Sequence, residues 1–294
     1  MNKFVSKKPV AAYLGPEGTF SHQASEKYFK KSATLLSCDS IPQVFESVCQ
    51  GTAQFGVVPI ENSSEGSIHL TLDAMLKEKQ ESEKSKKNAL TVFGEVALPI
   101  VHNLIGVSGM RWDAVDEIYG HPQAFAQCRE WLKSRARHVL TRSEAGSNAA
   151  AVLKISNQKN KAAIGPALMT ELYPQYKILE KGIQDLSSNK TRFWVISKQK
   201  PLRGSSNKTS LVFFCHDKPG ALLEVLKIFK KHEINLTKIE SRPSRKKEWE
   251  YYFFVDFLGH EEDPPIRKAL AALKKQTLYY WVLGSYPLSG KTGL

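Results

Sequence analysis

Short apolar runs alternate with amphipathic stretches along the first two thirds of this chain. Residues 10–14, 35–38 and 55–60 are mainly apolar, and each run ends in turn residues that lead into apolar positions at helical spacing. Runs of this length predict buried strands, and the stretches between them predict helices. Strands that alternate with helices favour an α/β fold with a mostly parallel sheet, whose ligands bind at the carboxyl ends of the strands.

The turn after residue 60 is therefore the first candidate site. Glu61, Asn62 and Ser63 follow the third strand directly, ahead of a helix through residues 70–75. Helix capping explains a serine at such a position, because its side chain can accept a hydrogen bond from a free backbone N–H group. Capping does not explain Glu61 and Asn62 directly after so apolar a strand, which indicates a role in a site.

Further strands and helices predict a second α/β lobe. The expected strands are residues 91–100, 104–107, 117–119, 137–141 and 162–165. The charged stretch 77–88 before them is most simply a solvated helix end and loop.

Several helices are predicted to begin at turns. Their N-termini lie at Thr19, Ser63, His121, Ser147 and Pro166. Free N–H groups and the positive end of the helix dipole make each a potential carboxylate site. A single one is weak evidence, but several around one cleft would suit a small dianion.

A strand begins within residues 189–193 and continues to residue 196. Thr191 and Arg192 are neighbours in it, so their side chains point to opposite faces. At most one of them can face a given pocket. A plain amphipathic strand entry would also explain these residues, with threonine present for its β propensity.

The last third of the chain has a different pattern. Residues 200–208 are rich in Lys, Pro, Gly, Ser and Asn and predict a linker. After it the pattern predicts a βαββαβ module of ferredoxin-like type. Its elements are strand 209–215, helix 221–232, strands 235–242 and 248–258, helix 264–275 and strand 279–286.

Composition and charge indicate which kinds of partner the protein can bind. The net charge is +13, from 42 basic and 29 acidic residues, but the basic residues are scattered and mixed with glutamate. This favours anionic small molecules and no nucleic acid partner. No apolar run resembles a signal peptide or a membrane span, so a cytoplasmic protein without a membrane partner is expected. The four cysteines are far apart, which argues against a zinc site.

Together, the motifs resemble those of prephenate dehydratase with a C-terminal ACT domain, over about residues 9–288. The motifs are residues 15–21 (GPEGTFS), 58–63 (VPIENS), 121–123 (HPQ), 127–128 (QC), 189–193 (NKTRF), 220–223 (GALL) and 240–243 (ESRP). The resemblance implies two α/β lobes around a cleft, as in periplasmic binding proteins. It divides the chain into a catalytic domain at 9–199, a linker at 200–208 and an ACT domain at 209–288.

The resemblance also implies an activity. Prephenate would lose carbon dioxide and its ring hydroxyl to give phenylpyruvate, a carbon–oxygen lyase step in phenylalanine biosynthesis. No redox change occurs, so no nicotinamide, flavin or metal is needed. The family's essential threonine corresponds to Thr191, which we expect to donate a hydrogen bond to the leaving oxygen. The proton source is open between Glu61 and His121. The substrate-binding residues implied are Thr19, Glu61, Asn62, Ser63, His121, Gln127, Ser147, Arg192 and Phe193.

Two roles remain open for Arg192, which could bind the retained carboxylate or pair with an acidic residue. The activity also has alternatives. Arogenate dehydratase performs the same elimination on a substrate with an amino group. A non-catalytic small-molecule-binding regulator could share the fold, since fold alone does not imply turnover. Thr191 argues against a mere receptor, which has no need of that donor.

In the ACT domain the resemblance implies a feedback site for L-phenylalanine. Its residues would be Gly220, Ala221, Leu222, Asn235, Leu236, Glu240 and Ser241. A homodimer or homotetramer built partly through ACT domains is also expected. The predicted strand 248–258 is apolar on both faces, which is more than one small module buries easily.

Overall fold

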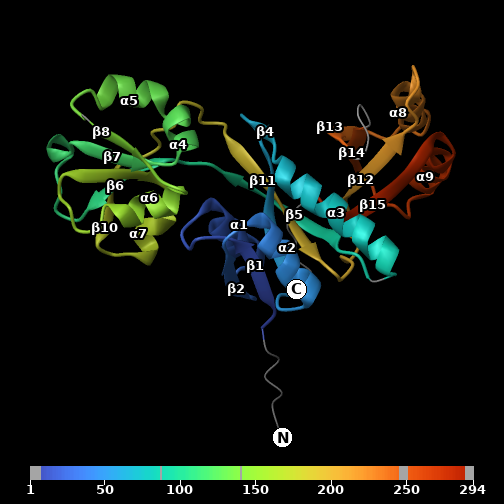
Figure 1. Ribbon diagram of the computed structural model, residues 1–294, viewed down its shortest axis with the longest axis horizontal. Helices are drawn as coiled ribbons and strands as arrows, with labels where there is room; N and C mark the ends of the chain where they lie inside the picture. The colour runs from blue at the N-terminus through green and yellow to red at the C-terminus, as the bar shows by residue number, and fades with distance from the viewer. Residues whose placement is uncertain (1–7, 87, 140, 245–250, 289–294) are drawn as a thin grey trace, which may run out of the picture. The chain divides into compact units, whose positions relative to one another are not determined.

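The computed structural model describes residues 8–86, 88–139, 141–244 and 251–288, and Figure 1 shows their helices and strands. These residues form two compact units. The first comprises the chain up to residue 44, residues 57–68 and residues 97–193, and the second comprises residues 45–56, 69–96 and those from 194 onward. In the described part no helix is both long enough and apolar enough to span a membrane.

The first lobe is built on a sheet with the order β2-β1-β3-β11-β5, in which β4 also pairs with β3. Strands β1 and β2 are parallel, whereas β3 and β4 form an antiparallel pair. The strands are β1 (Val10–Leu14), β2 (Thr34–Cys38), β3 (Phe55–Asn62), β4 (Gly66–Ser67), β5 (Thr91–Pro99) and β11 (Lys190–Ser197), and the helices are α1 (Phe20–Phe29), α2 (Ile41–Gln50) and α3 (His69–Ser85).

The second lobe has a sheet with the order β10-β6-β9-β7-β8. Leu104 and Ile105 are neighbours in β6 and are buried on opposite faces of the sheet, each in a different hydrophobic cluster. Helices therefore cover both faces of this sheet. The strands are β6 (Asn103–Val107), β7 (Glu117–Gly120), β8 (Thr141–Glu144), β9 (Lys161–Gly165) and β10 (Tyr176–Glu180). The helices are η1 (Trp112–Ala114), α4 (Pro122–Gln127), α5 (Arg129–Arg135), α6 (Asn148–Lys154) and α7 (Leu168–Leu172).

The expectation of mostly parallel strands is wrong for this second sheet. Strand β7 is parallel to β8 and β9, but β6 is antiparallel to both β9 and β10. Strand β6 receives the chain from the first lobe rather than from a preceding helix of its own lobe. It is therefore not bound by the βαβ geometry that makes consecutive strands parallel.

The C-terminal module confirms the predicted βαββαβ pattern. Its sheet order is β13-β14-β12-β15, and β12 is antiparallel to both β14 and β15. Helices α8 and α9 pack on one face, where Phe213, Val225 and Leu273 share a buried cluster. The elements are β12 (Asn207–Cys215), α8 (Ala221–Lys231), β13 (Leu236–Pro243), β14 (Tyr251–Leu258), α9 (Pro264–Gln276) and β15 (Thr277–Pro287).

The charged stretch 77–88 was expected to be a solvated helix end and loop, and this is only partly confirmed: residues 81, 83–86 and 88 are exposed, but Lys79 and Ser82 are buried. Helix α3 continues to Ser85. The Gln80 amide donates to the Tyr252 hydroxyl at 2.9 Å, so the polar side of α3 packs on the sheet of the C-terminal module. Because this contact is made by hydrogen bonds and not by a stripe of apolar side chains, the spacing of apolar residues does not predict it.

The apolar strand 248–258 does not need a second chain to bury both of its faces. Phe257 packs in the cluster under α8 and α9, whereas Tyr252 and Phe254, on the opposite face, are also buried within the chain. Tyr251 and Leu258 stay exposed. Trp249, which the expectation also used, lies outside the described residues. Gln80 of α3, outside the module, contacts Tyr252 on the second face, so the apolar strand does not by itself indicate a second chain, and the oligomeric state stays a prediction.

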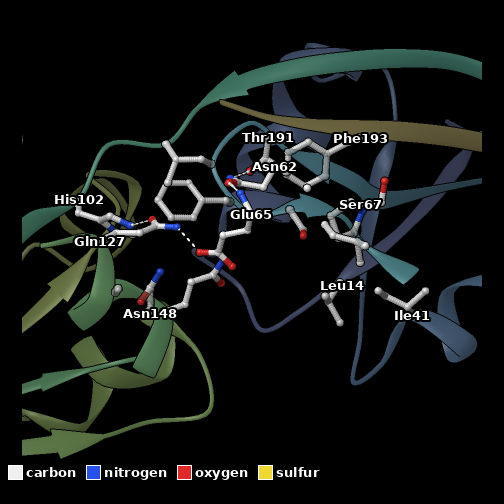
Figure 2. A pocket seen from close by; sticks show the side chains of 18 residues that line it. Leu14, Ile41, Asn62, Glu65, Ser67, His102, Gln127, Asn148, Thr191 and Phe193 are labelled. Atoms are coloured by element: carbon white, nitrogen blue, oxygen red, sulfur yellow. Dashed lines mark hydrogen bonds between the residues drawn. The ribbon is translucent and has the colours of Figure 1, made fainter. Parts of the chain in front are cut away.

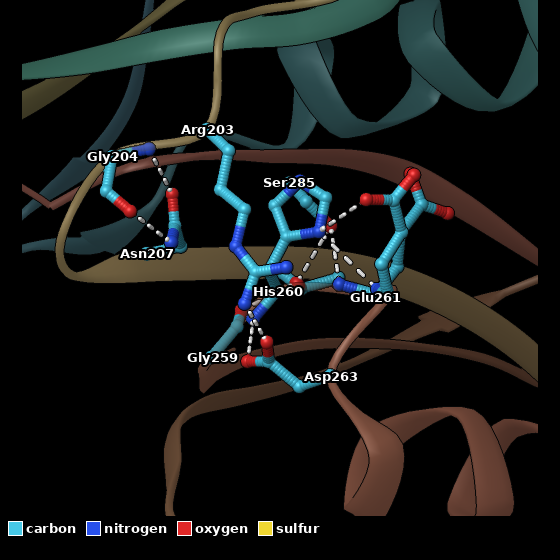
Figure 3. Close-up of polar contacts among 10 residues, drawn as sticks. Arg203, Gly204, Asn207, Gly259, His260, Glu261, Asp263 and Ser285 are labelled. Atoms are coloured by element: carbon cyan, nitrogen blue, oxygen red, sulfur yellow. Dashed lines mark hydrogen bonds and ion pairs between the residues drawn. The ribbon is translucent and has the colours of Figure 1, made fainter.

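The predicted linker is anchored to the C-terminal module (Figure 3). Arg203 forms an ion pair with Asp263 at the start of α9. Asn207 exchanges two hydrogen bonds of 2.9 Å with the backbone of Gly204. Strand β12 begins at Asn207, two residues before the predicted start. The boundaries of the linker and of both predicted domains stay predictions.

Candidate active site

A cavity of about 410 Å³ is lined by residues of both lobes, all of them in the first unit (Figure 2). This volume lies within the roughly 300–1,000 Å³ of small-molecule sites. Its lining combines apolar side chains with convergent polar ones. The lining residues include Leu14, Ser21, Ile41, Asn62, Glu65, His102, Gln123, Gln127, Asn148, Thr191 and Phe193.

Thr191 and Asn62 form the centre of the polar group. Strands β3 and β11 are neighbours, so the end of β3 places Asn62 beside the start of β11. The Asn62 amide nitrogen donates to the Thr191 hydroxyl oxygen at 2.9 Å and to the Asn189 side-chain oxygen at 2.9 Å. Because Thr191 accepts from Asn62, its hydroxyl hydrogen is available for an acceptor in the cavity.

The turn after β3 holds the Asn62 amide in this orientation. Its side-chain oxygen accepts from the backbone N–H groups of Ser64 at 3.0 Å and Glu65 at 3.2 Å. The amide oxygen is therefore occupied by donors, and the nitrogen must face Thr191 and Asn189. Asn62 is 6% exposed and Thr191 7% exposed, which limits competition by water.

Gln127 joins the two lobes across the cavity. Its amide oxygen lies 2.8 Å from His102 Nε2 and accepts from the Asn189 amide at 3.1 Å, and its nitrogen donates to a Glu65 carboxylate oxygen at 2.6 Å. His102 and Asn189 belong to the two chain segments that cross between the lobes. The Ile100 backbone N–H donates to the Asn189 carbonyl at 2.9 Å, so these segments also contact each other.

Arg192 points away from the cavity, as strand alternation predicts. Its guanidinium lies 3.0 Å from a carboxylate oxygen of Glu61. Neither residue lines the cavity. This ion pair is the structural role that the sequence left open for Arg192, and it engages one of the two expected proton sources.

Three of the predicted site residues cap helices instead of lining the cavity. Thr19 Oγ1 accepts from the His22 N–H at 3.3 Å, His121 Nδ1 from Gln123 at 3.3 Å, and Ser147 Oγ from Ala150 at 3.0 Å. The residues that follow each cap do line the cavity, Ser21 in α1, Gln123 in α4 and Asn148 in α6. The predicted helix start at Ser63 is wrong, because a turn and β4 follow it and α3 begins at His69.

Sequence reasoning missed Glu65, His102 and Asn148. His102 is 2% exposed, and burial lowers the pKa of its imidazole. The Asn148 side-chain oxygen is buried without a hydrogen-bond partner among the described residues. A signal existed for His102, which is one of two polar residues, with Asn103, between two predicted strands, and for Glu65, which lies in the turn already singled out.

The residues predicted to bind phenylalanine fall into two groups. Gly220, with a φ of 80°, precedes α8, and Ala221 and Leu222 beside it line a cavity of about 150 Å³. The other group lies at β13, with Asn235 before it and Leu236, Glu240 and Ser241 within it. None of the described residues of β13 lines that small cavity.

Strand β13 contacts α3 instead. Glu240 Oε1 lies 3.1 Å from His69 Nε2. Arg242 lies 2.9 Å from an Asp73 carboxylate oxygen. His69 and Asp73 are one helical turn apart, so one side of α3 carries both contacts.

Comparison with known proteins assigns the two parts of the chain. Residues 11–201 match the prephenate dehydratase family and residues 209–275 match the ACT domain family. A bifunctional chorismate mutase/prephenate dehydratase of Aquifex aeolicus is 42% identical over 283 residues, which are 96% of this chain and 75% of that protein. A prephenate dehydratase of Methanocaldococcus jannaschii is 38% identical over 282 residues, 94% of this chain and 97% of that protein.

A solved structure has the same fold over nearly the whole chain. It is a prephenate dehydratase of Arthrobacter aurescens in complex with L-Phe, with a TM-score of 0.82 and 31% identity, covering 94% of this chain and 89% of that one. The α/β fold with a separate ferredoxin-like module is thereby confirmed.

Proposed function

The chain belongs to the prephenate dehydratase family, and we propose that its cavity binds prephenate and converts it to phenylpyruvate. The substrate loses its ring carboxylate as carbon dioxide and its ring hydroxyl as water, and takes up one proton. Formation of an aromatic ring drives the reaction. The barrier lies in the poor leaving group, because hydroxide must be protonated or strongly hydrogen-bonded as it departs.

The contact between Asn62 and Thr191 carries this proposal. Asn62 holds the Thr191 oxygen as an acceptor at 2.9 Å, so the hydroxyl hydrogen can be directed at the leaving oxygen. An alcohol titrates far above neutrality, so Thr191 acts as a preorganised donor rather than as a free acid.

The other lining residues suit the rest of the substrate. The Gln127 amide nitrogen and the first turn of α1 around Ser21 offer N–H groups to the retained carboxylate. Leu14, Ile41 and Phe193 provide an apolar wall (Figure 2). A carboxylate beside such a wall is partly desolvated, which favours its loss as uncharged carbon dioxide.

Glu65 is the proton source that the geometry favours. It lines the cavity and is exposed to solvent, whereas Glu61 is paired with Arg192 and His121 caps α4. In its protonated form the Glu65 carboxyl group can pass a proton to the departing hydroxyl.

Turnover by the purified protein tests this function. With prephenate we expect phenylpyruvate, followed by its absorbance in alkali, and with arogenate in parallel much less phenylalanine. Arogenate dehydration is not favoured, because the matching family and the relatives described above are prephenate dehydratases. If only arogenate were converted, the protein would be an arogenate dehydratase. If neither compound were converted, the alternative of a non-catalytic regulator would be favoured.

Feedback inhibition by L-phenylalanine at the ACT domain is the second part of the proposal. The backbone before α8 leaves room for a ligand at Gly220, and α8 offers free N–H groups to a carboxylate. Among the described residues of one chain, none from β13 lines the small cavity beside Gly220. We therefore assign β13 of a second copy to complete the site, which requires a homodimer or homotetramer. Cytoplasmic location stays a prediction.

Helix α3 supplies the route by which such inhibition would reach the cavity. Residues 66–68 line the cavity, and α3 begins at the next residue. The contacts of His69 with Glu240 and of Asp73 with Arg242 tie this helix to β13. A ligand that shifts β13 would move α3 and so disturb the turn that carries Glu65.

We predict that Arg242→Met weakens inhibition by phenylalanine severalfold and leaves uninhibited kcat and KM nearly unchanged. The reason is that Arg242 and Asp73 are mostly buried and form three hydrogen bonds, so their loss uncouples β13 from α3. Inhibition curves at fixed prephenate measure this, with calorimetry to follow phenylalanine binding. Lys133→Met breaks an exposed ion pair with Glu130 in the second lobe and is the matched control. Unchanged inhibition in Arg242→Met would contradict the route through α3.

A further inference from the structure

We infer that His102 is a positioning residue for the reaction, because its Nε2–H group fixes the amide of Gln127 with the nitrogen directed toward Glu65 and the cavity. This role rests on the proposed function in so far as Gln127 contacts the substrate. Figure 2 shows the three side chains in line, from His102 through Gln127 to Glu65.

His102 is held rigidly at one crossing between the lobes. Its backbone N–H donates to the Gln184 side-chain oxygen at 3.0 Å, and its carbonyl accepts from Ile183 at 2.9 Å. The Phe20 ring packs against the imidazole edge to face, with 5.6 Å between ring centroids. These contacts hold the imidazole of His102 and therefore the direction in which its Nε2–H group points.

The amide of Gln127 has one favourable orientation in these surroundings. Its oxygen accepts from His102 at 2.8 Å and from Asn189 at 3.1 Å, which uses both lone pairs. Its nitrogen donates to Glu65 at 2.6 Å and retains a second N–H group. A flipped amide would set its nitrogen against two donors and its oxygen against a carboxylate.

This arrangement also fixes the protonation of the imidazole. The Gln127 oxygen can only accept, so His102 Nε2 must carry the hydrogen, and in the neutral ring Nδ1 is then an acceptor. Nδ1 is buried and has no hydrogen-bond partner among the described residues. Burial lowers the pKa of His102, which keeps the ring neutral.

The unpaired Nδ1 separates a positioning role from a packing role. A buried acceptor without a partner destabilises the fold, and a phenyl ring of nearly the same shape would avoid that penalty. If His102 served only to fill space, phenylalanine would serve at least as well. What the imidazole adds is the Nε2–H group that holds Gln127.

The variant His102→Phe tests the inference. We expect its melting temperature to match or exceed that of the wild type. We expect its KM for prephenate to rise about tenfold, the effect of one lost hydrogen bond, with a smaller fall in kcat. His102→Gln can place an amide nitrogen near the position of Nε2 and should recover most of the wild-type KM. The matched control is His138→Phe, which removes an exposed imidazole of the second lobe and should change neither constant.

A double variant shows whether His102 acts through Gln127. In a Gln127→Ala background, His102→Phe should have no further effect on KM, because the group that it positions is gone. An unchanged KM for His102→Phe in an active enzyme would overturn the inference and leave the proposed function intact. Additive effects in the double variant would also overturn it.

One readout does not depend on turnover. In the free protein, ¹⁵N NMR of the histidine rings should show the Nε2–H tautomer for the signal that disappears in His102→Phe. The Nδ1–H tautomer would overturn the inference whatever the protein does with prephenate. Failure of wild-type protein to form phenylpyruvate would instead refute the proposed function.

Discussion

Replacing Thr191 by valine should lower kcat for prephenate by roughly 10²–10³-fold, the usual effect of deleting one preorganised donor. Valine keeps the branched shape of the side chain of this residue, which is 7% exposed, and replaces only the hydroxyl by a methyl group. The Asn62 amide still has the Asn189 oxygen as an acceptor at 2.9 Å, so the fold should survive. Steady-state kinetics with the circular dichroism and melting temperature of the variant measure both effects.

The matched control for this prediction is Thr191→Ser. Serine retains a hydroxyl that can accept from Asn62, so its kcat should fall far less than that of Thr191→Val. A well-folded Thr191→Val enzyme within a fewfold of wild type would remove Thr191 from the reaction. In that case the donor to the leaving oxygen would have to be sought at Glu65, the other protic group of the cavity favoured above.

The sequence singled out Asn62 because it directly follows a buried strand, whereas Thr191, near the start of a strand, was assigned through the resemblance to the family. Side-chain alternation set Thr191 and Arg192 on opposite faces, and the structure has Thr191 in the cavity and Arg192 with Glu61. Caps were also readable, since Thr19, His121 and Ser147 each accept from the first turn of a helix. Strand ends and helix caps depend on residues that are adjacent in the chain, so a short stretch of sequence can predict them.

Partners that lie far apart in the chain could not be predicted in this way. Gln127 contacts His102 and Asn189 because the two segments that cross between the lobes contact each other there. No spacing of residues in the sequence predicts this contact. Glu65 lies in the turn already singled out, yet the hypothesis chose Glu61, whose pairing with Arg192 depends on β3 and β11 being neighbours. The polar side of α3 was hidden for a similar reason, because its partners are on β13 and β14.

The exchange of Asn62 for aspartate should produce a loss comparable to that of Thr191→Val, about 10²–10³-fold in kcat/KM, although the two side chains have the same shape. A carboxylate cannot donate to Thr191, so the hydroxyl hydrogen would turn toward the new carboxylate and away from the leaving oxygen. The added negative charge would also repel a dianionic substrate in a cavity with limited water.

Two measurements distinguish these causes. Asn62→Ala removes the donor without adding charge, so its KM should rise less than that of Asn62→Asp while kcat falls in both. As pH is lowered, the introduced carboxyl takes up a proton, loses its charge and becomes a donor again, so Asn62→Asp should recover activity relative to wild type. Equal KM values in the two variants, with no relative recovery at low pH, would mean that Asn62 faces neither the substrate charge nor the hydroxyl of Thr191 during turnover.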